Sequence, residues 1–211
     1  MTDPAHSYET HITLATHQES LAAVRAWAGA QGIKWTHIVL DRGQTPSQPM
    51  LTFWGTGDVS TLQGKAKEIA DAVQELGADA VRIKIEASIE NPAVPGNTVV
   101  QNPDESGYFE YHFKLLLPAQ ADLGRVTDVV APWGARLSRN ARRQRDDGCS
   151  EHFVTQRATG VDRTIADARC EQLRIALQLA GYDILEIEAE YVVFDSNLSL
   201  DLGWLGWGVQ E

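Results

Sequence analysis

Tyr8-Glu9-Thr10-His11-Ile12-Thr13-Leu14, near the start of the chain, is matched by Phe109-Glu110-Tyr111-His112-Phe113-Lys114-Leu115 in its second half. Both stretches read aromatic, Glu, any residue, His, any two residues, Leu. Stretches that recur in one order predict a duplicated fold, in which each copy is one supersecondary unit. Three more pairs of segments keep the order: 32–36 with 134–138, 52–57 with 155–160, and 84–87 with 186–189.

The alternation of apolar and polar residues predicts the same order of elements in each half: strand, helix, strand, strand, helix, strand. In the first half we expect them at 8–15, 19–32, 33–41, 50–55, 61–76 and 81–87. In the second half we expect them at 108–117, 120–131, an Arg-rich hairpin at 135–150, 151–157, 162–180 and 183–194. This order is that of the ferredoxin-like, or split βαβ, unit.

The predicted fold is therefore α+β: a tandem duplication of a ferredoxin-like βαββαβ unit, with two antiparallel sheets forming one pseudo-two-fold body. The repeats are expected over 1–88 and 108–195, joined by a linker at 89–107 that is rich in Pro, Asn and Gly. The apolar, Trp-rich tail 196–211 is expected to pack on the body. The alternative is that this tail binds a protein partner.

The charge, hydropathy and cysteine content of the chain argue against several classes of function. The 211-residue chain has a net charge of −11, which argues against generic nucleic-acid binding through phosphate neutralisation. No apolar run approaches the roughly 20 residues that span a membrane, and the first residues do not resemble a signal peptide. Two cysteines are too few for a disulfide framework or a cysteine zinc site. We expect a cytoplasmic protein that does not bind membranes.

Basic residues are concentrated at one place in this acidic chain. Five arginines fall within ten positions: Arg136, Arg139, Arg142, Arg143 and Arg145. Such a cluster is either a solvated loop or an anion-binding element, and the sequence leaves both open.

The paired histidines are the main candidates for chemistry. The first and last strands of a ferredoxin-like sheet are neighbours, so His11 should lie near Glu86 and His112 near Glu188. If the polar faces of the two halves meet, they enclose a charged groove or barrel. One imidazole could then act as a general base and the other as a general acid, each oriented by its glutamate. Candidate ligands for an anionic substrate are Thr13, Lys84, Lys114, Arg136 and Arg157.

His11-Ile12-Thr13-Leu14 resembles the His-x-Thr-x motif of the two-histidine (2H, LigT-like) phosphoesterase superfamily, whose members are also duplicated. The resemblance implies a hydrolase of phosphoester or phosphoanhydride bonds that needs no metal or other cofactor. Its substrate would be an anionic small molecule or a nucleotide. In that family the histidines transfer protons and the threonines hold the phosphate. Lys114 stands where the family has threonine or serine, and could bind phosphate as a point charge.

Glu110-Tyr111-His112-Phe113-Lys114 is also similar to the Glu-x-Glu-x-Lys strand of triphosphate tunnel (CYTH) enzymes. This second resemblance implies a charged barrel in which carboxylates hold Mg²⁺ or Mn²⁺ and basic residues grip a triphosphate. Residues suited to such a lining are Arg82, Lys84, Glu86, Arg136, Arg157, Glu186, Glu188 and Glu190.

Two further interpretations stay open. One is a metal site made of His11, His112 and one or two glutamates. The other is a non-catalytic module that binds an anion or a protein partner. Its contact surfaces would be the tail and the hairpin that carries Arg139 and Arg142. A hydrolase is the preferred hypothesis, but the sequence does not decide whether the protein is an enzyme.

Overall fold

The computed structural model describes residues 7–96, 107–144 and 148–205. The first half consists of β1 (Tyr8–Thr16), α1 (Gln18–Ala30), β2 (Lys34–Leu40), β3 (Ser47–Gly55), α2 (Val59–Gln74) and β4 (Ala78–Ser88). The second half consists of β5 (Tyr108–Pro118), α3 (Leu123–Val130), β6 (Arg136–Gln144), β7 (Cys149–Ala158), α4 (Arg163–Leu179) and β8 (Ile184–Asp195). Two short 3₁₀ helices, Ala131–Trp133 and Leu198–Asp201, complete the described elements.

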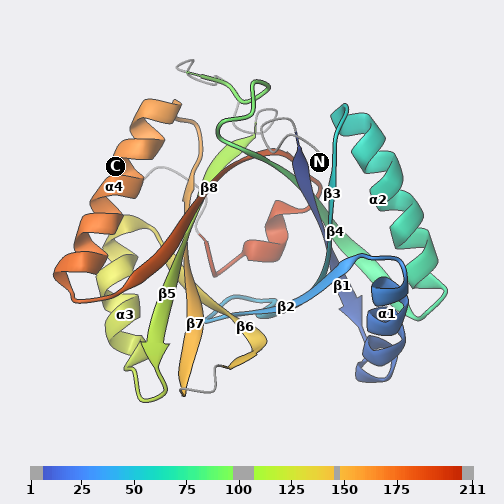
Figure 1. Cartoon of the computed structure of the whole chain (residues 1–211), viewed down its shortest axis with the longest axis horizontal. Helices are drawn as coiled ribbons and strands as arrows, with labels where there is room; N and C mark the ends of the chain where they lie inside the picture. The colour runs from blue at the N-terminus through green and yellow to red at the C-terminus, as the bar shows by residue number, and fades with distance from the viewer. Residues whose placement is uncertain (1–6, 97–106, 145–147, 206–211) are drawn as a thin grey trace.

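All these strands join one closed antiparallel barrel, in the order β1-β3-β2-β6-β7-β5-β8-β4 (Figure 1). The predicted ferredoxin-like body with two antiparallel sheets is therefore wrong. The outer strands of the first half, β2 and β4, pair with β6 and β8 of the second half instead of ending a sheet of their own. Closure gives each of these outer strands a partner over part of its length, residues 38–40 of β2 and 84–88 of β4. It thereby reduces the exposed strand edge, which gives a physical reason for this arrangement.

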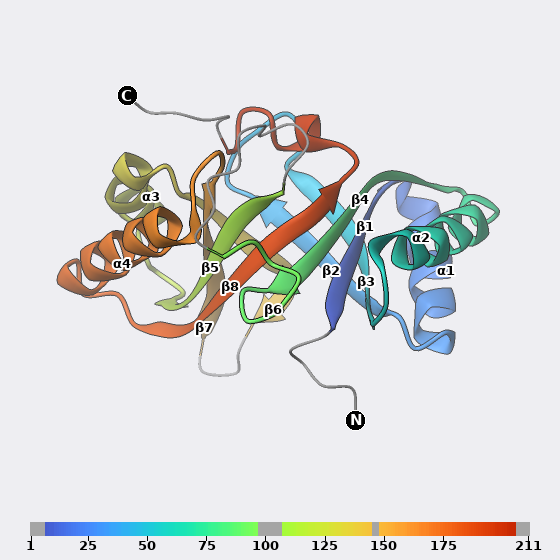
Figure 2. The ribbon, with the colours of Figure 1, turned by 90° about the horizontal axis from the view of Figure 1, so that it is seen from above.

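The helices take the apolar side of the strands and so fix which side faces inward. Figure 2 shows α1 and α2 on one flank of the barrel and α3 and α4 on the other. Helix α2 buries Leu62, Ala66, Ile69 and Val73, a helical stripe that packs against the outside of the strands. The Asp58 carboxylate caps this helix by accepting from the Thr61 N–H at 2.7 Å. No helix in the described ranges is long and apolar enough to cross a membrane.

Strand registers define which residues of the two halves correspond. Glu9 lies opposite Glu86, and Glu110 lies opposite Glu190. The counterpart of Glu86 is thus Glu190, two residues beyond the predicted Glu188. Shifting a strand by two residues leaves every side chain on the same face of the sheet, so the sequence match could not detect this difference.

The chain after β8 packs back onto the barrel. Leu200, Trp204 and Leu205 are buried, and the Trp204 indole N–H donates to the Leu137 carbonyl at 3.1 Å. Figure 1 shows this segment (red) inside the outline of the strands. Residues 206–211, with Trp207, lie outside the described part of the chain, so the predicted partner-binding role of the tail is not tested there.

We predict that Trp204→Ala will lower the free energy of unfolding by about 3–5 kcal/mol, the usual cost of removing a buried aromatic side chain. Urea denaturation followed by circular dichroism would measure the loss. The matched control is Trp54→Ala, because Trp54 is 52% exposed and its truncation should cost far less. Equal losses in the two variants would contradict the packing of the tail.

Candidate functional site

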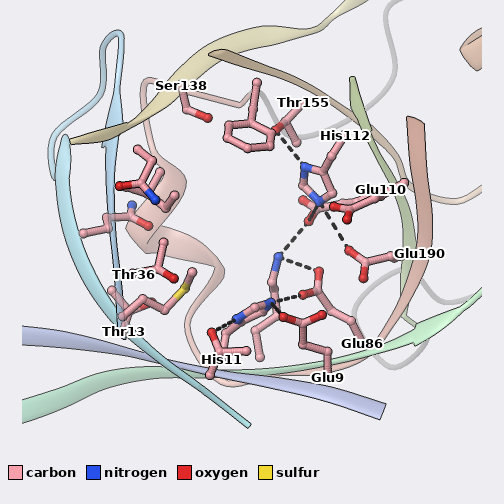
Figure 3. A pocket seen from close by; sticks show the side chains of 18 of the residues that line it. Glu9, His11, Thr13, Thr36, Glu86, Glu110, His112, Ser138, Thr155 and Glu190 are labelled. Carbon is pink, nitrogen blue, oxygen red and sulfur yellow. Dashed lines mark hydrogen bonds and ion pairs between the residues drawn. The ribbon is translucent and has the colours of Figure 1, made fainter. Parts of the chain in front are cut away.

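The barrel encloses a cavity of about 410 Å³. Charged and polar side chains face it because the helices cover the apolar face of each strand and strand residues alternate between the two faces. Trp35, Met50 and Phe153 add apolar surface to the lining. Figure 3 shows side chains from both halves converging inside the barrel. The acidic lining residues are Glu9, Glu86, Glu110, Glu186, Glu188, Glu190 and Asp201, and the basic ones are Lys34, Arg82, Lys84, Lys114 and Arg157.

Eight of the nine predicted site residues line this cavity: His11, Thr13, Lys84, Glu86, His112, Lys114, Arg157 and Glu188. The ninth, Arg136, is not part of the lining, and its guanidinium donates to the Ala135 carbonyl at 2.8 Å. Arg139 is exposed and also lies outside the lining, whereas the side chains of Arg142, Arg143 and Arg145 fall outside the described residues.

Sequence reasoning did not select three residues that complete the site. Glu110 and Glu190 were candidates only for the alternative tunnel-type barrel, Glu110 within its motif and Glu190 among its lining residues, and not among the preferred catalytic or substrate-binding residues. Glu110 alternates with His112 along one predicted strand, and Glu190 alternates with Glu188 along its neighbour. This alternation places all four side chains on one face and could have indicated a shared site. Asp201 follows the last strand in an apolar tail, and no local pattern of the sequence places it at the cavity.

His11 has a partner at each ring nitrogen. Its Nδ1 lies 2.8 Å from the Thr52 hydroxyl, and its Nε2 lies 2.7 Å from the Glu86 carboxylate. Lys84 Nζ approaches the other oxygen of Glu86 at 2.6 Å. Burial by itself would raise the pKa of Glu86, but Lys84 and His11 outweigh it and hold that pKa at about 2. Glu86 is therefore ionised at neutral pH.

The basic side chains deeper in the barrel are each held by two carboxylates. Lys84 Nζ also lies 2.8 Å from Glu110, and Arg157 contacts Glu110 at 2.7 Å and Asp201 at 2.6 Å. Burial opposes the charge of Lys84, yet Glu110 and Glu86 raise its pKa well above the usual range. An incoming phosphate would have to compete with these buried carboxylates for Lys84 and Arg157.

Arg82 extends the same network toward the tail. Its guanidinium contacts Asp201 at 3.0 Å and Asp195 at 2.5 Å. The Tyr108 hydroxyl donates to Asp195 at 2.6 Å. Buried ion pairs of this kind fix geometry, because removing one member leaves an uncompensated charge away from water.

His112, the counterpart of His11, has a different environment. Its Nδ1 lies 3.0 Å from the Thr155 hydroxyl, just as His11 faces Thr52. Its Nε2, however, lies 3.5 Å from Glu190 and 3.7 Å from Glu110. Burial lowers the pKa of His112, and the attraction of Glu110 does not reverse the shift. The imidazole is therefore neutral at neutral pH.

Glu190 lies against other carboxylates. Burial raises its pKa well above the usual range, and the charges of Glu86, Glu9 and Glu188 add to the increase against the opposing effect of Lys84. Within the described residues, no lysine or arginine forms an ion pair with Glu190 or Glu188. Donor atoms of Glu86, His112 and Glu190 lie within 4.8 Å of one another, close enough to share one ion.

Comparisons with known proteins add little about function. No family model and no curated protein matches the chain. Among solved structures, a mutant chlorite dismutase from Candidatus Nitrospira defluvii is 11% identical, with a TM-score of 0.32 over 93% of each chain. A dye-decolorizing protein from V. cholerae is 8% identical, with a TM-score of 0.28 over 92% of this chain and 95% of that one. Scores this low carry no argument about function.

The predicted duplicated ferredoxin-like fold is wrong, and the comparisons give no support to the predicted phosphoesterase function. One closed barrel replaces the two expected sheets. Two of the predicted phosphate ligands, Lys84 and Arg157, are already paired with carboxylates.

We predict that Glu190→Gln will stabilise the unliganded protein near pH 8 and have little effect near pH 4. The raised pKa means that the folded protein holds this proton more tightly than the unfolded chain does. The wild type therefore loses stability as the pH rises from the unfolded pKa of about 4.3 toward the folded value, and glutamine removes that loss.

Urea denaturation at the two pH values would measure the difference. Glu186→Gln on the same strand is the control, because the Glu186 side chain is 53% exposed and its replacement should change stability by no more than about 0.5 kcal/mol. Destabilisation by Glu190→Gln near pH 8 would show that the carboxylate is compensated in the unliganded fold.

Proposed function

We propose that the protein binds a small cation inside its barrel, against the carboxylates of Glu86, Glu188 and Glu190 beside His112. The observation that carries the proposal is the pair Glu188 and Glu190. Both line the cavity, and neither forms an ion pair with a lysine or arginine in the described part of the chain. The Glu190 side chain is only 18% exposed, whereas Glu188 is an exposed residue of the same strand. A largely buried carboxylate without a counter-ion, such as that of Glu190, is costly, and a bound cation would remove that cost.

The charge balance of the buried network supports the same conclusion. Its contacts connect five carboxylates with three basic side chains: Glu86, Glu110, Glu190, Asp195 and Asp201 with Arg82, Lys84 and Arg157. The network is thus two positive charges short when its carboxylates are ionised and the histidines are left out of the count. An anionic ligand would increase this imbalance, whereas a cation would reduce it.

The net charge of the whole chain also favours a positively charged ligand. Its net charge of −11 at pH 7 attracts cations from solution. The cavity of about 410 Å³ is large enough for a small molecule or for a hydrated ion. The proposal therefore replaces the expected anionic substrate with a cationic ligand and keeps a non-catalytic binding role.

We predict that a cation will raise the stability of the wild type, whereas inorganic phosphate will not. Methylammonium, ethylenediammonium, Mg²⁺, Mn²⁺ and Zn²⁺ chlorides form a suitable panel for thermal unfolding and titration calorimetry. A ligand that binds only the folded state adds about 2.7 kcal/mol at 100 times its Kd. The double variant Glu188→Gln/Glu190→Gln should weaken binding by about 2–5 kcal/mol, as expected when a buried charge partner is removed.

The matched control is Glu171→Gln. Glu171 is 53% exposed on α4 and pairs with Arg174 at the surface, so its loss should leave binding unchanged. Stabilisation by phosphate alone, with no response to any cation, would exclude the proposal and restore the anion-binding hypothesis.

A further inference from the structure

His11 and His112 differ in whether their Nε2 atom has a hydrogen-bond partner. The Nε2 of His11 is satisfied by Glu86 at 2.7 Å. The Nε2 of His112 has its nearest carboxylate oxygens at 3.5 Å and 3.7 Å, in Glu190 and Glu110, which is too far for a good hydrogen bond. When the Nδ1–H of His112 donates to Thr155, Nε2 presents a lone pair to the cavity. The His112 side of the barrel therefore offers an unpaired ligand atom, whereas the His11 side does not.

The distances around His112 match those between ligands of one metal ion. Donor atoms about 2.1 Å from a tetrahedral ion stand about 3.4 Å apart. His112 Nε2 and the Glu190 carboxylate are separated by 3.5 Å, and the donor atoms of Glu86, His112 and Glu190 all lie within 4.8 Å of one another. A small ion between these atoms would contact all three after modest side-chain adjustment.

The surroundings of these three side chains resemble the outer shell of metal sites. Metal-bound histidines usually have their second nitrogen held by a hydrogen bond, and the Thr155 hydroxyl, 3.0 Å from Nδ1 of His112, can accept the Nδ1–H in this way. Glu86 is likewise fixed, by Lys84 at 2.6 Å and by His11 at 2.7 Å. The three ligands come from β4, β5 and β8, which are adjacent in the barrel and hold them on a rigid support.

We propose that Glu86, His112 and Glu190 bind a divalent transition-metal ion inside the barrel. The proposal rests on the cation-binding function above and names the class of cation. An imidazole nitrogen with two carboxylates suits Zn²⁺ or Mn²⁺ better than Ca²⁺, which prefers oxygen ligands alone. Three protein ligands leave at least one coordination position facing the cavity, where water or a small ligand would bind.

Titration of the EDTA-treated, dialysed protein with ZnCl₂ and with MnCl₂ would test the site, by calorimetry and by native mass spectrometry. We expect one metal ion per chain. His112→Ala and Glu190→Gln should each weaken binding by at least about 100-fold, since even outer-shell partners of a metal ligand are worth about 10- to 100-fold. Circular dichroism and thermal unfolding of each apo variant would confirm folding, and His112→Gln serves if His112→Ala does not fold.

Two matched controls separate this site from other metal ligands. His37 lies on β2 beside Ser47 and is absent from the cavity lining, so His37→Ala should bind as the wild type does. Thr155→Val removes the hydrogen bond that orients His112 and should weaken binding by about 10- to 100-fold. Thr52→Val makes the same change beside His11 and should have a smaller effect.

The outcomes distinguish the two proposals. Loss of one tight metal equivalent in His112→Ala and Glu190→Gln, with retention in His37→Ala, would support the metal site. Binding of the organic ammonium ions without any metal would overturn the metal site and leave the cation-binding function standing. Full metal affinity in His112→Ala would also overturn it, because the ion would then be bound elsewhere. Binding of neither kind of cation would remove both proposals.

Discussion

The antiparallel pairing of β4 with β8 is the interaction on which the rest of the structure depends. It joins the last strand of one half to the last strand of the other, and pairs Glu86 with Val192 and Ser88 with Glu190. Together with the shorter β2–β6 pairing, it closes the barrel and places the polar faces of both halves around one cavity. Without this pairing, Glu86 and Glu190 would belong to separate sheets, and the shared electrostatic network could not form.

Much of the wall of this cavity could be predicted from the sequence, but its closure could not. The alternation around His11 and His112 correctly places both histidines on a polar face, since helices take the opposite, apolar face. The same alternation is satisfied whether β4 ends a sheet or pairs with β8, so the two-sheet prediction failed. The role of Glu190 depends on a register that sequence matching misplaced by two residues. The position of Asp201 at the cavity depends on the path of the chain after β8, which no periodicity of the sequence predicts.

The two halves of the chain share the same order of strands and helices, but differences in sequence give the surroundings of His11 and His112 different charges. Thr52 and Thr155 make the same contact with the two histidines. Beyond this contact the halves diverge: Lys84 lies opposite His11 on the neighbouring strand, whereas Glu188 lies opposite His112. A lysine on one side therefore neutralises Glu86, while a glutamate on the other adds negative charge near Glu190. A symmetric scaffold can in this way hold a single, off-centre site.

The pairing of β4 with β8 also bears on how the protein is made. The first half leaves the ribosome with β2 and β4 lacking the neighbours that they have in the finished barrel, and exposed strand edges invite pairing with other chains. β8 covers one of these edges only after the rest of the second half has been made, and Asp201, which binds Arg82 and Arg157, follows later still. Nascent chains must therefore keep a long strand edge from aggregating until β8 has been made, and this barrel is most vulnerable to aggregation during that interval.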